Sequence, residues 1–231
     1  MFTQLTRHYQ LLLDVARLPV ARLHFDTSLH PEDVAATHRA FTRPHPRYKL
    51  FPHKALGAAL IHLAAHASPA AYLDSIKGRH GGAGHAGKAR ARGYRLSLIE
   101  RNDHIDALHA INTALAQRQG RPMDPHYLAR TERYVALPHY RYYGVFNPAQ
   151  QLVAYCNLGC YGNFAAFAQL LGLRNNDGIM HMLVTDIAQQ LIAEARLDYL
   201  MYDTFFGAQP GLRSFKTMLG FQPYRAKYTI R

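Results

Sequence analysis

The sequence predicts a mixed α+β fold, in which helices flank a mostly antiparallel sheet. Strand-like segments joined by short turns cluster between residues 134 and 171, which is typical of an antiparallel meander. A long amphipathic helix pattern over 176–196 and an apolar strand pattern over 197–206 follow. The 231 residues, 48% hydrophobic and 18% charged, suffice for one large domain and exclude a disordered or coiled-coil chain.

The patterns before residue 94 are weaker. The expected elements there are a strand at 20–25 and helices at 54–66 and 70–76. Five glycines between residues 78 and 87 predict a flexible, basic loop. We therefore expect residues 1–93 to form a helical or irregular extension that carries this loop, and residues 94–231 to form a separate domain.

The pattern sharpens from residue 94 onward. Residues 94–98 alternate between apolar and polar side chains, which predicts a half-buried strand. Asn102 or Asp103 can cap the next helix, and Gly120 and Pro122 would end it. The remaining elements are predicted as strands at 134–137, 140–146, 152–161 and 164–171, a helix at 176–196, a strand at 197–206, a short helix at 212–219 and a strand from 221 onward.

The chain is strongly basic, with a formal net charge of +12. Residues 77–101 hold seven basic residues and one acidic residue, which is half of that net charge. This segment is either a contact surface for an anionic partner or a solvated, mobile loop.

The two cysteines, Cys156 and Cys160, are predicted to remain unbridged. On one extended strand they would lie about 13 Å apart, at roughly 3.3 Å per residue, which is too far for a disulfide. Unbridged thiols suit a reducing compartment. The first residues lack the apolar core of a signal peptide, and the longest apolar stretch, 55–73, is too weak for a bilayer span. We expect a cytoplasmic protein without membrane insertion.

The order of these elements resembles that of the GNAT acyltransferase superfamily over residues 94–231. The segment 215–221, Phe-Lys-Thr-Met-Leu-Gly-Phe, is similar to the last helix of the FemAB-related branch, as is the basic stretch before Tyr94. The resemblance implies a GNAT-like acyltransferase domain in which two middle strands of the sheet splay apart and hold an acyl thioester between them. Strands 152–161 and 197–206 would be that pair.

The resemblance also implies where the donor binds. Pantetheine would pair with exposed backbone of strand 152–161 near Asn157 and Gly159, unless this is an ordinary strand close to its turn. The next helix would begin with a turn whose N–H groups bind pyrophosphate. The matching positions are Asn175, Asn176, Gly178 and Ile179. Asp177 departs from the pattern, because a capping carboxylate would satisfy the same N–H groups and repel an anion.

Acyl transfer to an amine needs a neutral nucleophile, a polarised carbonyl and a protonated leaving group. Asp203 is a candidate base, because burial in its apolar strand would raise the pKa of its carboxyl. Tyr202 on the opposite face of the strand is the alternative. Either side chain could instead cap neighbouring backbone.

Two further sites follow from the resemblance. Lys216 stands where many GNAT enzymes have a tyrosine that acts as the general acid. It would contact the donor or substrate unless it is a solvated helix residue. Arg118, Gln119 and Arg121 correspond to the acceptor-facing loop, where two guanidiniums would bind an anionic acceptor unless they are solvated surface. His62 and His66 share a predicted helix face but have no evident third ligand, so no metal site is predicted.

These features predict an N-acyltransferase in which an amine of a small, anionic acceptor attacks an acyl thioester directly. The co-substrate would be acyl-CoA or the thioester of an acyl carrier protein. A Fem-like transferase that uses aminoacyl-tRNA is the rival prediction. A third prediction is a catalytically inactive module that binds nucleic acid through residues 77–101.

Overall fold

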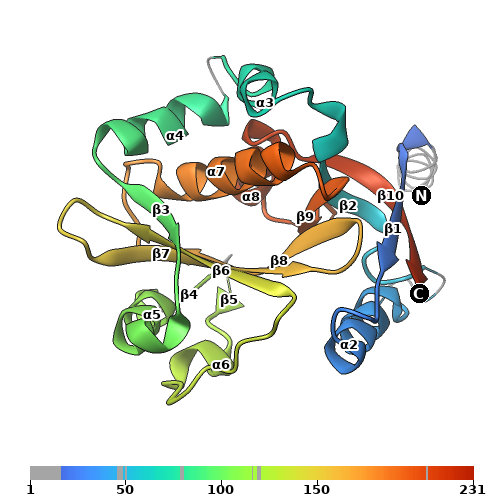
Figure 1. The fold of residues 1–231 in the computed structure, drawn as a ribbon, viewed down its shortest axis with the longest axis horizontal. Coiled ribbons are helices and arrows are strands. Elements are labelled where there is room, and N and C mark those ends of the chain that lie inside the picture. Colours follow the sequence, from blue (N-terminus) through green and yellow to red (C-terminus); the bar gives the residue numbers. More distant parts are fainter. Residues whose placement is uncertain are drawn as a thin grey trace, which may run out of the picture.

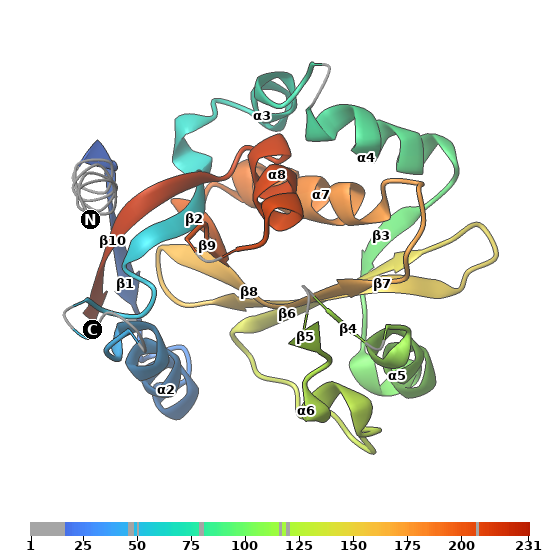
Figure 2. The same cartoon turned by 180° about the vertical axis from the view of Figure 1, so that it is seen from behind.

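A computed structural model describes residues 17–45, 49, 51–78, 81–115, 117–118, 121–206 and 208–231. Its centre is an eight-stranded sheet in the order β1-β10-β2-β9-β8-β7-β6-β3, drawn in Figures 1 and 2. All neighbours are antiparallel except β1 with β10 and β8 with β9. The strands are β1 (Val20–Phe25), β2 (Leu56–His62), β3 (Arg95–Leu98), β6 (Tyr140–Phe146), β7 (Leu152–Cys160), β8 (Phe164–Gly172), β9 (Tyr199–Thr204) and β10 (Gln222–Ile230). Residues from both sides of position 93 thus build one sheet.

Helices cover both faces of this sheet, which confirms the mixed α+β prediction. The helices α3, α4, α7 and α8 lie on one face, and α2, α5 and α6 lie on the other (Figures 1 and 2). The helices are α2 (Pro31–Thr42), α3 (Pro69–Ser75), α4 (Gly82–Ala91), α5 (Ile105–Thr113), α6 (Pro125–Leu128), α7 (Ile179–Glu194) and α8 (Pro210–Met218), with short 3₁₀ turns η1 (Leu63–Ala65) and η2 (Arg101–His104). None of these described helices is long and apolar enough to cross a bilayer.

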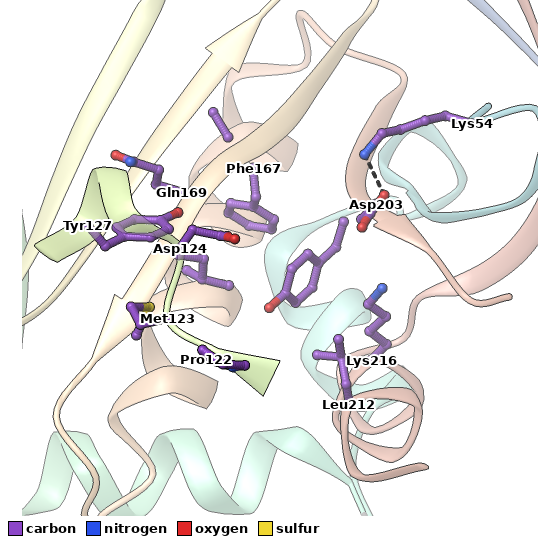
Figure 3. A pocket seen from close by; sticks show the side chains of 13 residues that line it. Lys54, Pro122, Met123, Asp124, Tyr127, Phe167, Gln169, Asp203, Leu212 and Lys216 are labelled. Carbon is purple, nitrogen blue, oxygen red and sulfur yellow. Dashed lines mark hydrogen bonds and ion pairs between the residues drawn. The ribbon is translucent and has the colours of Figure 1, made fainter. Parts of the chain in front are cut away.

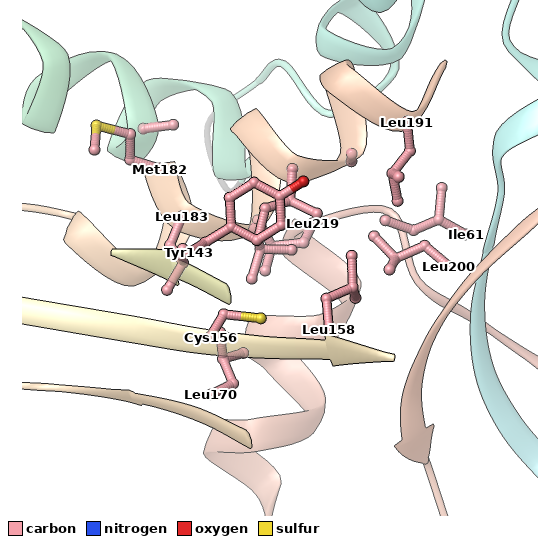
Figure 4. Packing of buried hydrophobic residues seen from close by; sticks show 14 of the residues in the cluster. Ile61, Tyr143, Cys156, Leu158, Leu170, Met182, Leu183, Leu191, Leu200 and Leu219 are labelled. Carbon is pink, nitrogen blue, oxygen red and sulfur yellow. The ribbon is translucent and has the colours of Figure 1, made fainter. Parts of the chain in front are cut away.

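The main core lies between α7 and the sheet (Figure 4). Leu183, Ile187 and Leu191 recur along α7 at the spacing that places them on one face, and all three are buried. They pack in one cluster with buried side chains of the sheet, including Tyr143, Cys156, Leu158, Leu170 and Leu200. Cys156 and Cys160 are free thiols, as predicted.

Two predicted elements before residue 94 are wrong. Residues 56–62 form β2 rather than a helix, because this strand is covered on both faces and its continuous apolar run carries no alternation. The glycine-rich segment forms α4 rather than a flexible loop. Gly82, Ala86 and Ala89 are buried on one side of α4, so the small residues allow it to pack closely on its neighbours.

The prediction that strands 152–161 and 197–206 splay apart is also wrong for the first of these strands. β8 lies between β7 and β9, so residues 152–161 do not border residues 197–206. The physical reason is that β8, α7 and β9 form a crossover unit, whose parallel strands become neighbours. β8 pairs with β9 at only three positions, from Phe164–Tyr199 to Ala166–Met201. Beyond them the two strands diverge, so the sheet does have a gap, one strand away from the predicted place.

Candidate active site

A cavity of about 220 Å³ lies where β8 and β9 diverge (Figure 3). We call it the gap cavity. Its walls come from residues 167–170 of β8, residues 202–203 of β9, α8 and the segment 122–127. The register of β8 against β7 shifts at Ala168, which is an extra residue on β8. Such a bulge bends a strand, and here it lies at the mouth of the gap.

Lys216 on α8 is the most unusual group of this cavity. Its side chain lines the cavity although the residue is only 1% exposed. Nζ donates a hydrogen bond to the Thr204 carbonyl at 2.8 Å and lies 4.7 Å from the centre of the Tyr202 ring. Burial lowers the pKa of Lys216 to about 8. An ammonium with this pKa is a better proton donor near neutral pH than an ordinary lysine.

Asp203 lies beside Lys216, at the end of β9 (Figure 3). Its carboxylate forms an ion pair with Lys54 at 2.5 Å, and its side chain is 57% exposed. The predicted burial of Asp203 is therefore wrong. The residue has φ of 53°, a left-handed conformation that costs energy for a residue with a side chain and turns the backbone at the gap. Tyr202, the alternative base, packs its ring against Phe167 at 5.5 Å across the gap.

The predicted pyrophosphate turn is packed against α4. Asp177 does not cap α7; its carboxylate pairs with Arg92 and accepts a hydrogen bond from the Tyr94 hydroxyl at 2.7 Å. Gly178 has φ of +84°, and a Cβ added there would lie 2.2 Å from the His85 carbonyl oxygen. The space beside Gly178 is thus filled by α4 backbone.

The other residues of this turn have structural contacts. Asn175 accepts a hydrogen bond from the Asp177 amide at 3.1 Å, and the Asn176 carbonyl accepts one from Lys88 at 2.6 Å. Ile179 is buried in the main core. None of these three residues lines the gap cavity.

The predicted donor contacts on β7 also lie apart from the cavity. β7 is hydrogen-bonded to β6 on one side and β8 on the other, so it has no free edge for a pantetheine. Asn157 is buried and donates a hydrogen bond to Gln169, which does line the cavity. Gly159 leaves room for the Tyr161 ring, since an added Cβ would lie 2.3 Å from the Tyr161 hydroxyl.

The predicted acceptor turn lies next to the cavity. Gln117–Arg118 (β4) and Arg121–Pro122 (β5) pair as a short hairpin. Gln119 lies outside the described residues, as do the side chains of Arg118 and Arg121. The chain that leaves this hairpin contributes Pro122, Met123, Asp124 and Tyr127 to the cavity wall.

Sequence reasoning missed these wall residues and Lys54. No sequence signal indicates Lys54, because it lies in a predicted helix and is separated from Asp203 by 149 positions of sequence. The wall residues 122–127 follow a recognised turn but carry no motif that assigns them to a site.

Most basic side chains in the described part of the segment 77–101 have partners within the molecule. Lys77 pairs with Asp74, Arg90 with Asp186 and Arg92 with Asp177. Arg101 donates to the Val135 carbonyl and lies over the Tyr142 ring at 3.8 Å. These pairs reduce the positive charge that the segment offers to a nucleic acid.

Within the described residues, no cluster of three metal-ligating side chains occurs. His62 stacks on Tyr199 at 4.7 Å, and His66 lies against Tyr72 at 5.3 Å. The two histidines therefore make separate ring contacts, His62 at the end of β2 and His66 directly after η1.

Comparison with known proteins extends the description of the fold. No protein-family model and no curated protein matches the sequence. FemX superposes with a TM-score of 0.55 at 9% identity, covering 73% of this chain and 59% of FemX. A conserved protein of unknown function from Bacteroides thetaiotaomicron gives 0.53 at 15% identity, covering 72% and 56%. The C-terminal domain of a protein assigned as a lysylphosphatidylglycerol synthetase, from Agrobacterium fabrum, gives 0.50 at 17% identity, covering 72% and 57%.

The chain spans less than two thirds of the length of each of these three proteins. The likeness nevertheless covers 72–73% of this chain. The protein therefore has a GNAT-like fold of the FemAB-like kind.

Proposed function

We propose that the protein is an acyltransferase that moves an aminoacyl group from aminoacyl-tRNA onto an amine. The observation that carries this proposal is the gap cavity, where the buried Lys216 lies beside Asp203. The fold supports it, since proteins named FemX and lysylphosphatidylglycerol synthetase share this architecture.

The proposed reaction is a direct attack at the ester carbonyl. The amine nitrogen forms a bond to the carbonyl carbon, and the bond from that carbon to the ribose oxygen breaks. Lys216 gives a proton to the departing oxygen, and Asp203 accepts the proton released by the amine. Solvent then returns both groups to their starting states. Lys54 and Lys216 also disfavour a positive charge nearby, which favours the neutral, nucleophilic form of the amine.

The packing of α4 argues for a donor without a pyrophosphate at the start of α7. A diphosphate beside Gly178 would meet the carbonyl oxygen of His85 and the carboxylate of Asp177. The carbonyl oxygen carries a partial negative charge and the carboxylate a full one, and the α4 backbone occupies the space, so binding there would require α4 to move. An aminoacyl ester needs no such turn, because its tRNA can be held by phosphate contacts elsewhere on this basic protein.

The test is a comparison of donors. Purified protein is incubated with tRNA charged with labelled amino acids, with labelled acyl-CoA and with a labelled acyl carrier protein, each with a mixture of primary amines. We expect a new labelled amide from charged tRNA, lost after RNase treatment. Transfer from acyl-CoA alone would overturn the tRNA donor and leave the acyltransferase proposal standing. Absence of any amide would overturn both.

Replacement of Asp203 tests its role as the base. We expect Asp203→Asn to lower turnover roughly a hundredfold, because the amide cannot accept the proton. Asn tolerates the left-handed φ of 53°, and the lost ion pair with Lys54 is exposed, so the melting temperature should hardly change. Wild-type turnover in this variant would remove Asp203 from the mechanism.

A further inference from the structure

A second cavity, of about 360 Å³, opens on the α2 face of the sheet. We call it the α2 cavity. Its floor is aromatic: Phe41, Tyr140, Tyr161 and Phe167 contribute rings, and the hydroxyls of Tyr140 and Tyr161 bond to each other at 2.7 Å. This volume lies within the range of small-molecule sites. Rings that are already held together offer a rigid surface for an apolar group.

The α2 cavity and the gap cavity meet at the divergence of β8 and β9. Lys54, Phe167, Ala168 and Asp203 line both of them. Lys216 lines the gap cavity and is absent from the lining of the α2 cavity. The leaving group must be next to its proton donor, so the donor carbonyl belongs in the gap cavity. The nucleophile then has to approach Asp203 from the α2 cavity.

The rim of the α2 cavity is positively charged. Arg43 lies on this rim, is exposed, and has no acidic partner in the described part of the chain. Lys54 is already paired with Asp203. Burial lowers the pKa of His53, which disfavours a positive charge on this third rim group. The guanidinium of Arg43 can thus donate two parallel hydrogen bonds to a carboxylate and neutralise its charge.

We propose that the α2 cavity is the acceptor subsite, and that it takes an amine with an apolar, ring-sized body and a carboxylate. The ring would lie on Phe41, Tyr140 and Tyr161, the carboxylate on Arg43, and the amine at Asp203. This inference rests on the proposed function for the role of the amine. Binding of the ligand does not depend on turnover, so the two can be tested apart.

The binding test uses L-phenylalanine as a probe, with L-phenylalaninamide lacking the carboxylate and L-alanine lacking the ring. Saturation-transfer NMR on the full chain measures each dissociation constant. We expect L-phenylalanine to bind at least tenfold more tightly than either relative, a difference of about 1.4 kcal/mol. Arg43→Gln should remove the preference over the amide. Equal binding of all three probes, or binding of none, would overturn the proposal.

A blocking variant locates the site. Ala40 lines the α2 cavity from an exposed position of α2, and Ala36 is exposed one turn earlier without lining it. We expect Ala40→Trp to weaken L-phenylalanine binding at least tenfold and Ala36→Trp to leave it unchanged. Equal effects of both variants would place the probe elsewhere.

Turnover separates this inference from the proposed function. If transfer occurs and Ala40→Trp leaves the acceptor KM unchanged, the subsite is wrong and the acyltransferase stands. If the probe binds as expected and no donor transfers to any amine, the subsite stands as a binding site and the acyltransferase is wrong.

Discussion

Replacement of Lys216 by methionine is expected to lower turnover by roughly a hundredfold to ten-thousandfold, the range for loss of a general acid. Methionine keeps much of the volume of the side chain in the gap cavity, so the change removes the proton and the charge with little change in packing. Lys54 is the one other lysine, arginine or histidine among the described residues that lines the gap cavity, and it is paired with Asp203. We expect no nearby group to replace Lys216.

The pH dependence of wild-type turnover should also report whether Lys216 is the proton donor. Burial lowers the pKa of Lys216 from 10.5 to about 8, so the ammonium loses its proton as the pH rises through 8. Values of kcat/KM should fall on the alkaline side with an apparent pKa near 8. The Lys216→Met variant should lack this alkaline limb. If kcat/KM of the variant still falls above pH 8, a group other than Lys216 is responsible for the decrease.

The stability of the wild-type protein should rise with pH over the range in which its activity falls. A lysine whose folded pKa is lowered costs stability while it is charged, and this cost is fully present below pH 8. The cost is relieved as the pH rises from 8 to 10.5, because the folded protein releases the proton while the unfolded chain keeps it. The shift corresponds to roughly 3 kcal/mol. The lost hydrogen bond to Thr204 offsets part of the gain from methionine.

We therefore expect Lys216→Met to be at least as stable as the wild type at pH 7 in urea unfolding, and to lose that advantage towards pH 10. The matched control is Lys227→Met on β10, whose side chain is exposed and lines neither cavity. It should keep wild-type turnover. Wild-type turnover in Lys216→Met, measured with the donor that the protein accepts, would exclude Lys216 from the chemistry.

The sequence predicted the second half of the fold better than the first. The long helix α7 has a clean apolar face, and its spacing alone predicts it. β2 is an alanine-rich run buried on both faces, so only its neighbours in the sheet decide that it is a strand. α4 packs closely on α7 through glycine and alanine. The number of glycines alone suggests a loop and does not predict this packing.

The residues of the candidate site, too, can be predicted only in part from the sequence. The position of Asp203 in an apolar strand at the expected gap suggests it as a base, and the resemblance of the last helix to a known family indicates Lys216; the structure brings both to one cavity. The partner of Asp203, Lys54, lies far away in sequence and could be found only from the folded sheet. The donor positions on β7 and at the start of α7 were placed by analogy. These positions do not line the gap cavity, because β8 lies between β7 and β9 and α4 packs against the turn.

Replacement of Gly178 by alanine is expected to have the largest effect on stability. The residue has φ of +84°, which costs about 1–2 kcal/mol for a residue with a Cβ. The added Cβ would also lie 2.2 Å from the His85 carbonyl oxygen, a backbone atom of α4 that cannot rotate away. We expect a total loss of about 2–4 kcal/mol, which lowers the melting temperature by roughly 4–16 °C at this chain length.

A substitution at Gly84, within α4, is the matched control. Gly84 is exposed, and a Cβ added there meets no atom within 4 Å. Gly84→Ala should raise stability by about 0.5–1 kcal/mol, because alanine is the better helix former. The opposite signs of the two substitutions would show that the contact at Gly178, rather than glycine content, determines the effect.

The Gly178→Ala variant also distinguishes a packing role from a phosphate cradle. If α4 fills the space beside Gly178, the protein that remains folded should keep the wild-type donor KM, since the donor does not bind there. If the turn held a pyrophosphate, the added methyl group would raise the donor KM while the stability changed little. A raised donor KM in a stable Gly178→Ala protein would restore coenzyme A as the donor, because the turn would then be open to phosphate in solution.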